Sequence, residues 1–350
     1  MRPTRMGKVV DVHTHFLPLE VVEYFRSGEG PEAVQVVDRG SEAPLIVHAN
    51  GLRYPVFPSF HDPAAKLDQM DRDGIDISVV SISASLFLFD LEPDETARVH
   101  RIINDAAAAY AAAGDGRIAA MATIPMNDPV AAGEELQRAH DELGLRGAEI
   151  GTSVEGTMLD DPELDPFFTT AEKLGVPIML HPYTSMIGDP PAGFTGFHLS
   201  NVIGNPLETC VAASRLVVGG VFDRHPDLRV LLVHAGGSFP YQLGRLDHAY
   251  DAREETKAVA RREPSAYLDN LLFDTIAFDP RALEFLISVA GSSQLMFGTD
   301  IPFDMKDLAT RDDVAGLPAA EDILGANAIR AFGLEGSVEL EPARRAKAES

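Results

Sequence analysis

Short apolar runs of β-strand type alternate with Ala- and Leu-rich segments of helical type along most of this 350-residue chain. Parallel strands need long crossover connections, which are usually helices, so the alternation predicts a parallel sheet covered by helices. The runs of strand type cover residues 8–15, 77–82, 118–124, 147–151, 177–181, 229–234, 271–276 and 295–300. Strand and helix pairs of this number in a chain of this length predict an α/β fold of the (β/α)8, or TIM-barrel, type.

A doubly wound open sheet is the competing arrangement for the same alternation. It ordinarily carries a Gly-rich phosphate-binding loop after its first strand. The segment His13-Thr14-His15-Phe16 stands at that place in this chain and is not such a loop. We therefore expect the barrel.

Residues 18–62 interrupt the alternation. They contain two strand-like runs, at 33–37 and 44–47, followed by Asn50-Gly51, which is a typical hairpin turn. We expect a small β-rich insertion after the first strand, lying over the barrel mouth. The remainder is expected to form one domain over residues 1–340, and the polar last residues, 341–350, are expected to be disordered.

The charge balance is strongly acidic. Lys and Arg number 29 against 54 Asp and Glu, which gives a formal net charge of −25. This field repels nucleic acid and anionic membrane surfaces unless a local basic patch opposes it. The densest basic run, Arg261-Arg262, is flanked by Glu255 and Glu263. We expect neither nucleic acid nor a membrane as a partner.

The number of cysteines and the character of residues 1–8 indicate the cellular compartment. Cys210 is the only cysteine, so the chain forms no intrachain disulfide and suits a reducing cytoplasm. The start, residues 1–8, is polar and has no signal-peptide character, and no apolar stretch is long enough to cross a bilayer. These features predict a cytoplasmic location.

Two histidines alternate at the end of the first expected strand, in Val12-His13-Thr14-His15. Alternate residues of a strand point to one face, and neutral imidazoles are good Zn²⁺ ligands. Pro18 then ends regular pairing, so the histidines lie at the carboxyl end of the strand, where such folds place their active sites.

Three further strand ends carry residues that a metal ion would use. His181 ends the run 177–181, His234 ends 229–234, and Asp300 ends 295–300. Taken singly, a histidine after an apolar strand is usually a hydrogen-bonded core residue, and an aspartate there is usually a turn residue. Taken together at one rim, these residues and the histidine pair predict a metal site.

Long ordered motifs stand around and between these residues, within a resemblance that covers nearly the whole chain. The most specific are DVHTHFLP at 11–18, GGVFDRHP at 219–226, HAGGSFP at 234–240 and GTDIPF at 298–303. In these motifs the chain resembles the amidohydrolase superfamily, and within it the decarboxylase branch typified by aminocarboxymuconate-semialdehyde decarboxylase.

The resemblance implies a ligand set. His13, His15, His181 and Asp300 would bind one metal ion, with a water completing the site; Zn²⁺ is expected, and Mn²⁺ suits the same mixture of imidazole and carboxylate. His234 would stand beside that water as a proton shuttle. Asp300 would also accept a hydrogen bond from the water, which gives it a catalytic role besides its role as a ligand.

A metal ion, a bound water and a proton shuttle suit two reactions. In a non-oxidative decarboxylase, the carbon that bears the carboxylate is protonated or hydrated before CO₂ leaves; in a hydrolase, hydroxide attacks a polarised carbonyl. The resemblance favours a decarboxylase of a small conjugated or aromatic carboxylic acid. A hydrolase or hydratase of a lactone, amide or unsaturated acid is the alternative. A noncatalytic barrel is a third reading, which the converging metal-site groups oppose.

The substrate carboxylate needs a cation. Arg245 matches a position that, in the resembling branch, grips the substrate from the neighbouring subunit, so the resemblance implies a homodimer. A planar guanidinium binds a carboxylate in two places. The ordinary alternative is a helix-surface charge paired with Asp247 or another neighbour.

The expected mouth of the pocket departs from that branch. Arg53 is displaced by two residues from a second substrate-binding arginine. Tyr183 replaces a tryptophan, and Phe278 replaces a histidine. Phe87 and Phe89 follow the second expected strand and either line the pocket or simply pack. We therefore expect a changed substrate.

Overall fold

A computed structural model describes residues 7–49, 53–183 and 193–336. Parallel strands form the centre of its fold. One sheet has the order β1-β5-β6 and the other β14-β13-β12-β11-β8-β7. The strands are β1 (Val10–Phe16), β5 (Ile77–Ile82), β6 (Ile118–Ala120), β7 (Ala122–Thr123), β8 (Ala148–Gly151), β11 (Ile178–His181), β12 (Val230–Leu232), β13 (Leu271–Asp274) and β14 (Leu295–Met296). The α/β class and the parallel pairing are as predicted.

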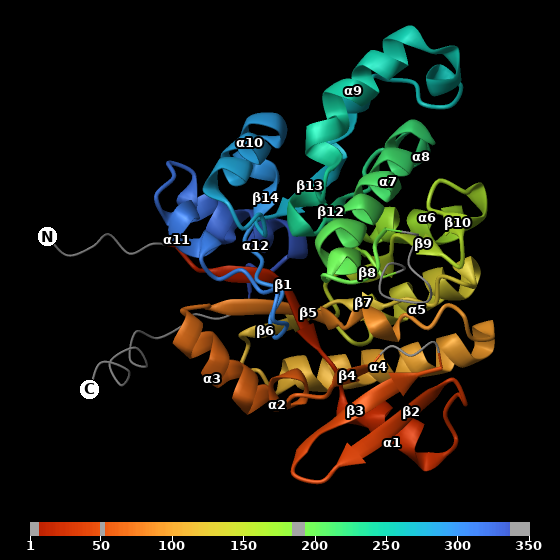
Figure 1. The fold of residues 1–350 in the computed structure, drawn as a ribbon, viewed down its shortest axis with the longest axis vertical. Coiled ribbons are helices and arrows are strands. Elements are labelled where there is room, and N and C mark those ends of the chain that lie inside the picture. Colours follow the sequence, from red (N-terminus) through yellow and green to blue (C-terminus); the bar gives the residue numbers. More distant parts are fainter. Residues whose placement is uncertain (1–6, 50–52, 184–192, 337–350) are drawn as a thin grey trace, which may run out of the picture.

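Helices flank these sheets in Figure 1. They are α3 (Pro63–Asp73), α4 (Pro93–Ala112), α5 (Pro129–Asp141), α6 (Asp165–Leu174), α7 (Asn205–Val218), α8 (Val221–Arg224), α9 (Phe239–Ala252), α10 (Pro280–Ala290), α11 (Thr310–Ala315) and α12 (Asn327–Phe332). Several begin with an aspartate followed by proline. Asp62, Asp128 and Asp279 each accept a backbone N–H of the first turn, which satisfies a donor that the helix leaves free.

Most expected strands begin and end within two residues of their predicted bounds, and two depart from the prediction in other ways. The third, 118–124, is two short strands separated by Met121. The last, 295–300, is regular only over Leu295–Met296, and Asp300 at its predicted end takes a left-handed backbone conformation with φ of 61°. Backbone hydrogen bonds nevertheless join this segment to β1, from Val12 N to Phe297 O at 3.0 Å and from His15 N to Ile301 O at 2.7 Å.

Apolar side chains from successive strands form a separate buried cluster with α12. Its strand members include Val12, Val79, Met179 and Leu272, and Phe332 of α12 packs against them. A second, larger cluster lies between the sheets and the surrounding helices. Burial of apolar surface on both faces of the strands explains why their sequences are continuous apolar runs.

A three-stranded antiparallel sheet stands between β1 and β5 in the chain. It consists of β2 (Val34–Arg39), β3 (Glu42–His48) and β4 (Arg53–Pro55), and the helices α1 (Leu19–Ser27) and α2 (Pro58–His61) flank it in sequence. A short hairpin, β9 (Ser153–Val154) and β10 (Thr157–Met158), follows β8. The predicted turn at Asn50-Gly51 and the predicted tail at 341–350 lie outside the described residues.

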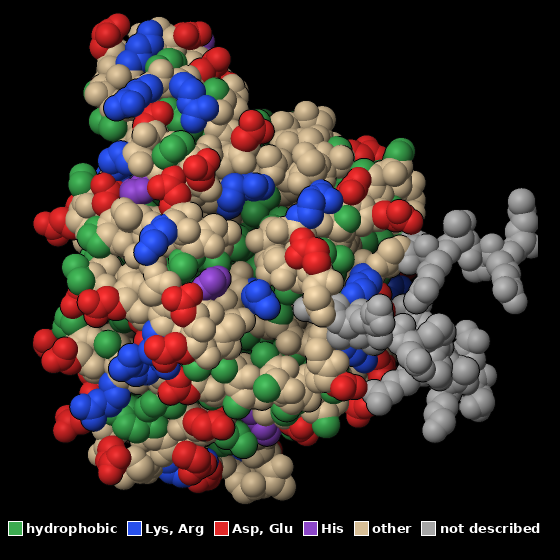
Figure 2. Space-filling model, turned by 180° about the vertical axis from the view of Figure 1, so that it is seen from behind, with side chains coloured by type: hydrophobic (Ala, Val, Ile, Leu, Met, Phe, Trp, Pro, Cys, Tyr) green, Lys and Arg blue, Asp and Glu red, His purple; other side chains and the backbone are tan. Residues whose placement is uncertain are grey.

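Basic and acidic side chains are interspersed on the face of the molecule shown in Figure 2. None of the helices in the described part of the chain combines the length and apolar composition needed to span a bilayer.

Candidate metal centre

His13 and His15 lie on β1, where the pairing with β5 shifts register between Asp11 and Thr14. Both rings are buried. The Nδ1 atom of His13 donates to Asp274 Oδ2 at 2.7 Å, and Nδ1 of His15 donates to the carbonyl of Ile82 at 3.0 Å. Each ring therefore leaves an unprotonated Nε2, and these two atoms lie 3.2 Å apart. Two facing lone pairs repel each other, so this geometry favours a cation between them.

His181 ends β11 and completes a trio of imidazoles. Its Nδ1 donates to the carbonyl of Pro182 at 2.8 Å, while its Nε2 is buried and has no hydrogen-bond partner among the described residues. The ring centroid lies 5.3 Å from that of His13 and 5.2 Å from that of His15. The three Nε2 atoms therefore have the same donor chemistry and are available to one ion.

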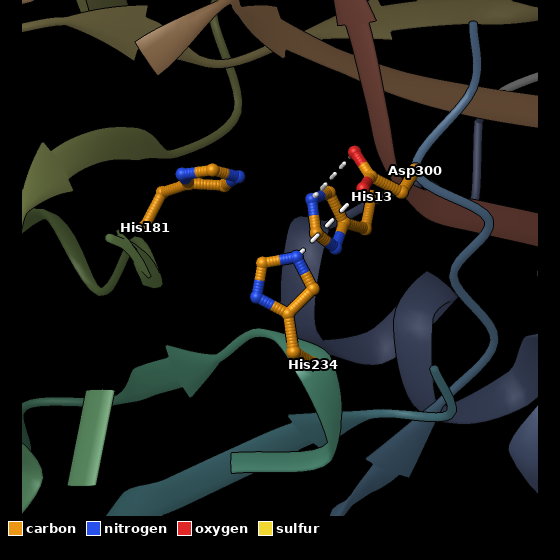
Figure 3. A group of neighbouring side chains, drawn as sticks. All are labelled: His13, His181, His234 and Asp300. Carbon is orange, nitrogen blue, oxygen red and sulfur yellow. Dashed lines mark ion pairs between the residues drawn. The ribbon is translucent and has the colours of Figure 1, made fainter. Parts of the chain in front are cut away.

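His234 and Asp300 follow β12 and β14; in Figure 3, Asp300 lies beside His13, with His181 opposite them and His234 on a separate segment below. Asp300 Oδ1 lies 3.1 Å from His15 Nε2, and its Oδ2 lies 3.8 Å from His234 Nε2. One ligand atom from each of His13, His181, His234 and Asp300 lies within 4.8 Å of the others. The structure thus brings together all five residues that the sequence placed at one rim, and their nitrogen and carboxylate donors fit a divalent metal.

Asp274, at the end of β13, was not assigned a role from the sequence. It is fully buried. Besides the bond from His13, it accepts the backbone N–H of His234 at 2.9 Å and that of Ala235 at 2.7 Å. One carboxylate therefore orients the first histidine and the loop that carries His234. Its position at a strand end was the available signal, but its partner, 261 residues away, was not visible in the sequence.

Burial and neighbouring charge set the ionisation of the cluster. Burial lowers the pKa of His181 well below its usual range, and the nearby His15 and His13 lower it further, which keeps this imidazole neutral. Burial would raise the pKa of Asp300, but the neighbouring His15 and His234 side chains hold it well below its ordinary value. Burial likewise opposes protonation of His234, yet the nearby carboxylate of Asp300 raises the pKa of His234 overall.

Aromatic side chains stand around the next strand ends. Phe87 and Tyr183, both predicted to line the pocket, are buried with ring centroids 5.4 Å apart, and Phe89 lies 5.6 Å from Tyr183. Tyr183 donates its hydroxyl to Ser153 O at 3.0 Å. Phe303, to which the sequence assigned no role, lies 5.2 Å from His15.

The predicted arginines are not among the residues of this cluster. Arg245 lies exposed in the middle of α9, and Arg53 is exposed at the start of β4. Phe278 is 57% exposed, with a left-handed backbone φ of 57°. Within one copy of the described chain, the cluster therefore contains no arginine.

The fold and the cluster are those of a metal-dependent α/β enzyme. Residues 10–334 match the amidohydrolase family, and this chain belongs to that family. It is 31% identical over 333 residues to 2-amino-3-carboxymuconate-6-semialdehyde decarboxylase of Dictyostelium discoideum, covering 93% of this chain and 92% of the relative. It is 33% identical to gamma-resorcylate decarboxylase of Rhizobium sp. (strain MTP-10005), covering 78% and 87%. The apo structure of Metarhizium anisopliae IDCase superposes with a TM-score of 0.78 at 28% identity, covering 95% of this chain and 98% of that one.

Proposed function

We propose that this chain is a metal-dependent non-oxidative decarboxylase, a carboxy-lyase, of a small conjugated or aromatic carboxylic acid. One observation carries the proposal: His13, His15 and His181 each direct Nδ1 outward to a fixed acceptor and leave Nε2 facing Asp300 or one another. The relatives at 31% and 33% identity, whose names specify decarboxylation of a conjugated and an aromatic acid, supply the reaction class.

His13, His15, His181 and Asp300 would hold the ion, and their mixed donors suit Zn²⁺ and Mn²⁺ alike. A divalent cation bound there would act as a Lewis acid on the substrate. Asp300 would stay ionised, as its depressed pKa favours. One ligand atom from each of His13, His181, His234 and Asp300 lies within 4.8 Å of the others, and His15 is not in this group. His234 is therefore the alternative to His15 as the fourth ligand.

His234 would move the proton. Its Nε2 faces Asp300 Oδ2 at 3.8 Å, and its Nδ1 has no hydrogen-bond partner among the described residues. The nearby Asp300 raises the pKa of His234, which favours a protonated ring that could deliver its proton to the substrate carbon. Asp274 keeps the loop in place through the backbone of His234 and Ala235.

The finer architecture belongs to the same proposal. The eight strand positions would close into a (β/α)8 barrel, since β1 bonds through Val12 and His15 to the segment that follows β14. Residues 18–62 would be an insertion over its mouth, and residues 1–340 one domain. Tyr54 of the insertion supports this placement, because its side chain is buried and Ser85, which follows β5, lies near enough to act on the pKa of its hydroxyl. A cytoplasmic location stays a prediction.

A homodimer would supply the missing cation. Ile203, Leu207 and Val211 form an apolar stripe of helical spacing whose side chains are 50%, 45% and 45% exposed. The stripe lies on and just before α7, which packs against α9, the helix of Arg245. A second copy covering this stripe would bury apolar surface and place Arg245 where it binds the carboxylate of the partner's substrate.

The decisive experiment measures CO₂ release against substrate loss. Metal-free protein is reconstituted with Zn²⁺ or Mn²⁺ and given gamma-resorcylate and a panel of conjugated acids. We expect one CO₂ for each substrate lost, only in metal-loaded protein. Loss of substrate with addition of water and without CO₂ would establish the alternative, a hydratase or hydrolase.

A further inference from the structure

Asp300 follows β14 with a left-handed backbone, at φ of 61°, and hydrogen bonds tie its neighbourhood to β1. Its own N–H donates to the carbonyl of His13 at 2.7 Å, and the carbonyl of Ile301 accepts the N–H of His15 at 2.7 Å. A non-glycine residue with positive φ occupies a sparsely populated conformation, which persists where the surrounding contacts hold it. The contacts around Asp300 therefore decide where its carboxylate points.

Thr14 lies between the two histidines of β1, and its buried hydroxyl holds the carbonyl of Ile301. Thr14 Oγ1 accepts a hydrogen bond from Lys66 Nζ at 2.6 Å and donates to Ile301 O at 3.0 Å. An ammonium group only donates and a carbonyl only accepts, so the hydrogen of this hydroxyl is directed to Ile301. Lys66, itself buried on α3, thereby fixes the direction of the hydroxyl.

Thr299 precedes Asp300, and its buried hydroxyl holds the N–H of Ile301. Thr299 Oγ1 accepts this N–H at 3.3 Å and donates to Asp11 Oδ2 at 2.7 Å. A backbone N–H only donates, so the direction of this hydroxyl is fixed as well. Asp11 Oδ1 also accepts the N–H of His13 at 3.2 Å. Both polar backbone groups of Ile301 are therefore bound to threonine hydroxyls, each of which has a second, charged partner.

These bonds hold the chain on both sides of Asp300. Its carboxylate lies 3.1 Å from His15 Nε2 and beside His13 in the cluster (Figure 3). Valine at the two threonine positions would fill nearly the same space without burying a hydroxyl. A buried polar network in which every member is satisfied instead specifies one conformation of the groups it joins. Here the group so specified is the backbone next to a proposed metal ligand.

We propose that Thr14 and Thr299 are positioning residues of the metal centre. Through the backbone of Ile301, they hold Asp300 in its left-handed conformation with the carboxylate directed at the imidazoles. The inference rests on the proposed function, because it needs a metal ion at this cluster. Neither hydroxyl would touch the metal or the substrate, and Lys66 and Asp11 would act one step further out, by fixing the direction of the two hydroxyls.

The test measures the affinity of metal-free protein for Zn²⁺ and for Mn²⁺ by competition with a chelator. Thr14→Val and Thr299→Val remove one hydroxyl each and should bind both metals about 10- to 100-fold more weakly, the range seen when an outer partner of a metal ligand is removed. Thr14→Ser and Thr299→Ser keep the hydroxyl and should stay within about threefold of the natural protein.

Thr209→Val is the matched control, since Thr209 is a buried threonine of α7 whose hydroxyl donates to Asn205 O at 3.2 Å. It should bind both metals as the natural protein does. Melting temperatures of the metal-free proteins show which variants fold. Thr14→Val leaves the Lys66 ammonium without this partner, so the double variant with Lys66→Met replaces it if the single variant does not fold.

A chain that already lacks the Asp300 carboxylate separates positioning of Asp300 from a general disturbance of the site. Asp300→Ala leaves the three imidazoles, and adding Thr299→Val should weaken its residual metal binding no further. A further loss of about tenfold or more would show that the hydroxyl acts on the histidines or the fold, and would overturn the inference. If Asp300→Ala holds no metal, the contrast between the serine and valine variants decides, and natural affinity in the valine variants overturns the inference.

The natural protein and His15→Ala complete the set. If the natural protein binds neither metal, the proposed metal centre itself is wrong. If it binds metal, His15→Ala does not, and the valine variants at Thr14 and Thr299 bind normally, only the positioning role of the two threonines fails.

Discussion

Asp274 accepts a hydrogen bond from His13 Nδ1 at 2.7 Å, across 261 residues of chain. The bond fixes the tautomer of the imidazole, so that Nε2 faces the cluster, and makes this nitrogen more basic. The same carboxylate accepts the backbone N–H groups of His234 and Ala235. A residue outside the proposed ligand set therefore positions both a proposed ligand and the proposed proton shuttle.

Asp274→Asn should lower metal affinity about 10- to 100-fold, because an amide is a weaker acceptor than a carboxylate and cannot serve all these donors. Chelator competition with metal-free protein measures the effect. Asp279→Asn is the matched control, since Asp279 caps α10 and asparagine caps equally well. Equal affinities in the two variants would show that the His13 contact has no bearing on the metal.

His234→Ala should retain most of the metal and lose turnover by about 10²- to 10⁴-fold, because it removes the proton donor and leaves four proposed ligands. Metal content and steady-state kinetics are measured on the same preparation, beside His181→Ala. A loss of metal equal to that in His181→Ala would make His234 a ligand and sink its assignment as the shuttle.

Whether Arg245 acts across a dimer can be tested by combining two different inactive subunits in one dimer. Arg245→Ala and His234→Ala should each be inactive alone. Co-expressed with different tags, they should recover about a quarter of full activity, because half of randomly formed dimers are mixed and each mixed dimer has one intact site. If Arg245 serves its own subunit, every site keeps one defect and no activity returns.

Leu207→Glu should convert the proposed dimer to a monomer, because a charge in the centre of the apolar stripe would be buried without a partner. Sedimentation equilibrium measures the change. Val130→Glu places the same charge on α5, where Val130 is 59% exposed, and should leave the assembly intact. A dimer that survives Leu207→Glu would move the interface elsewhere.

The buried His100 side chain should make the free energy of unfolding fall in acid. Burial lowers the pKa of His100 from 6.5 to about 4, although its bonds to the carbonyls of Leu86 and Phe87 oppose the shift. The unfolded chain therefore takes up a proton first as pH falls. The stabilising effect of a neutral His100 is complete above pH 6.5 and is lost as pH falls toward 4.

His100→Gln keeps an N–H donor and does not titrate. The natural protein should lose more free energy of unfolding than this variant between pH 6.5 and 4, by up to about 3 kcal/mol. Urea unfolding at a series of pH values checks the difference. Parallel pH profiles for the two proteins would rule out His100 as the source.

The alternation of apolar runs and helical segments determined the α/β class and the parallel strands, because both features depend on local periodicity. The residues at the carboxyl ends of strands were predictable for a related reason. Parallel strands bring those ends to one rim, so His13, His181 and Asp300 had to converge once the strands were located.

Only the tertiary structure decided which side chains support that rim. The bond between Asp274 and His13 depends on strands far apart in the chain, and the position of Ser81 beside His15 depends on the pairing register of β1 and β5. Register and long-range contacts are set by how the whole core packs, which no local pattern records. The role predicted for Arg245 shows a related limit, since this exposed residue lies outside the cluster of its own chain.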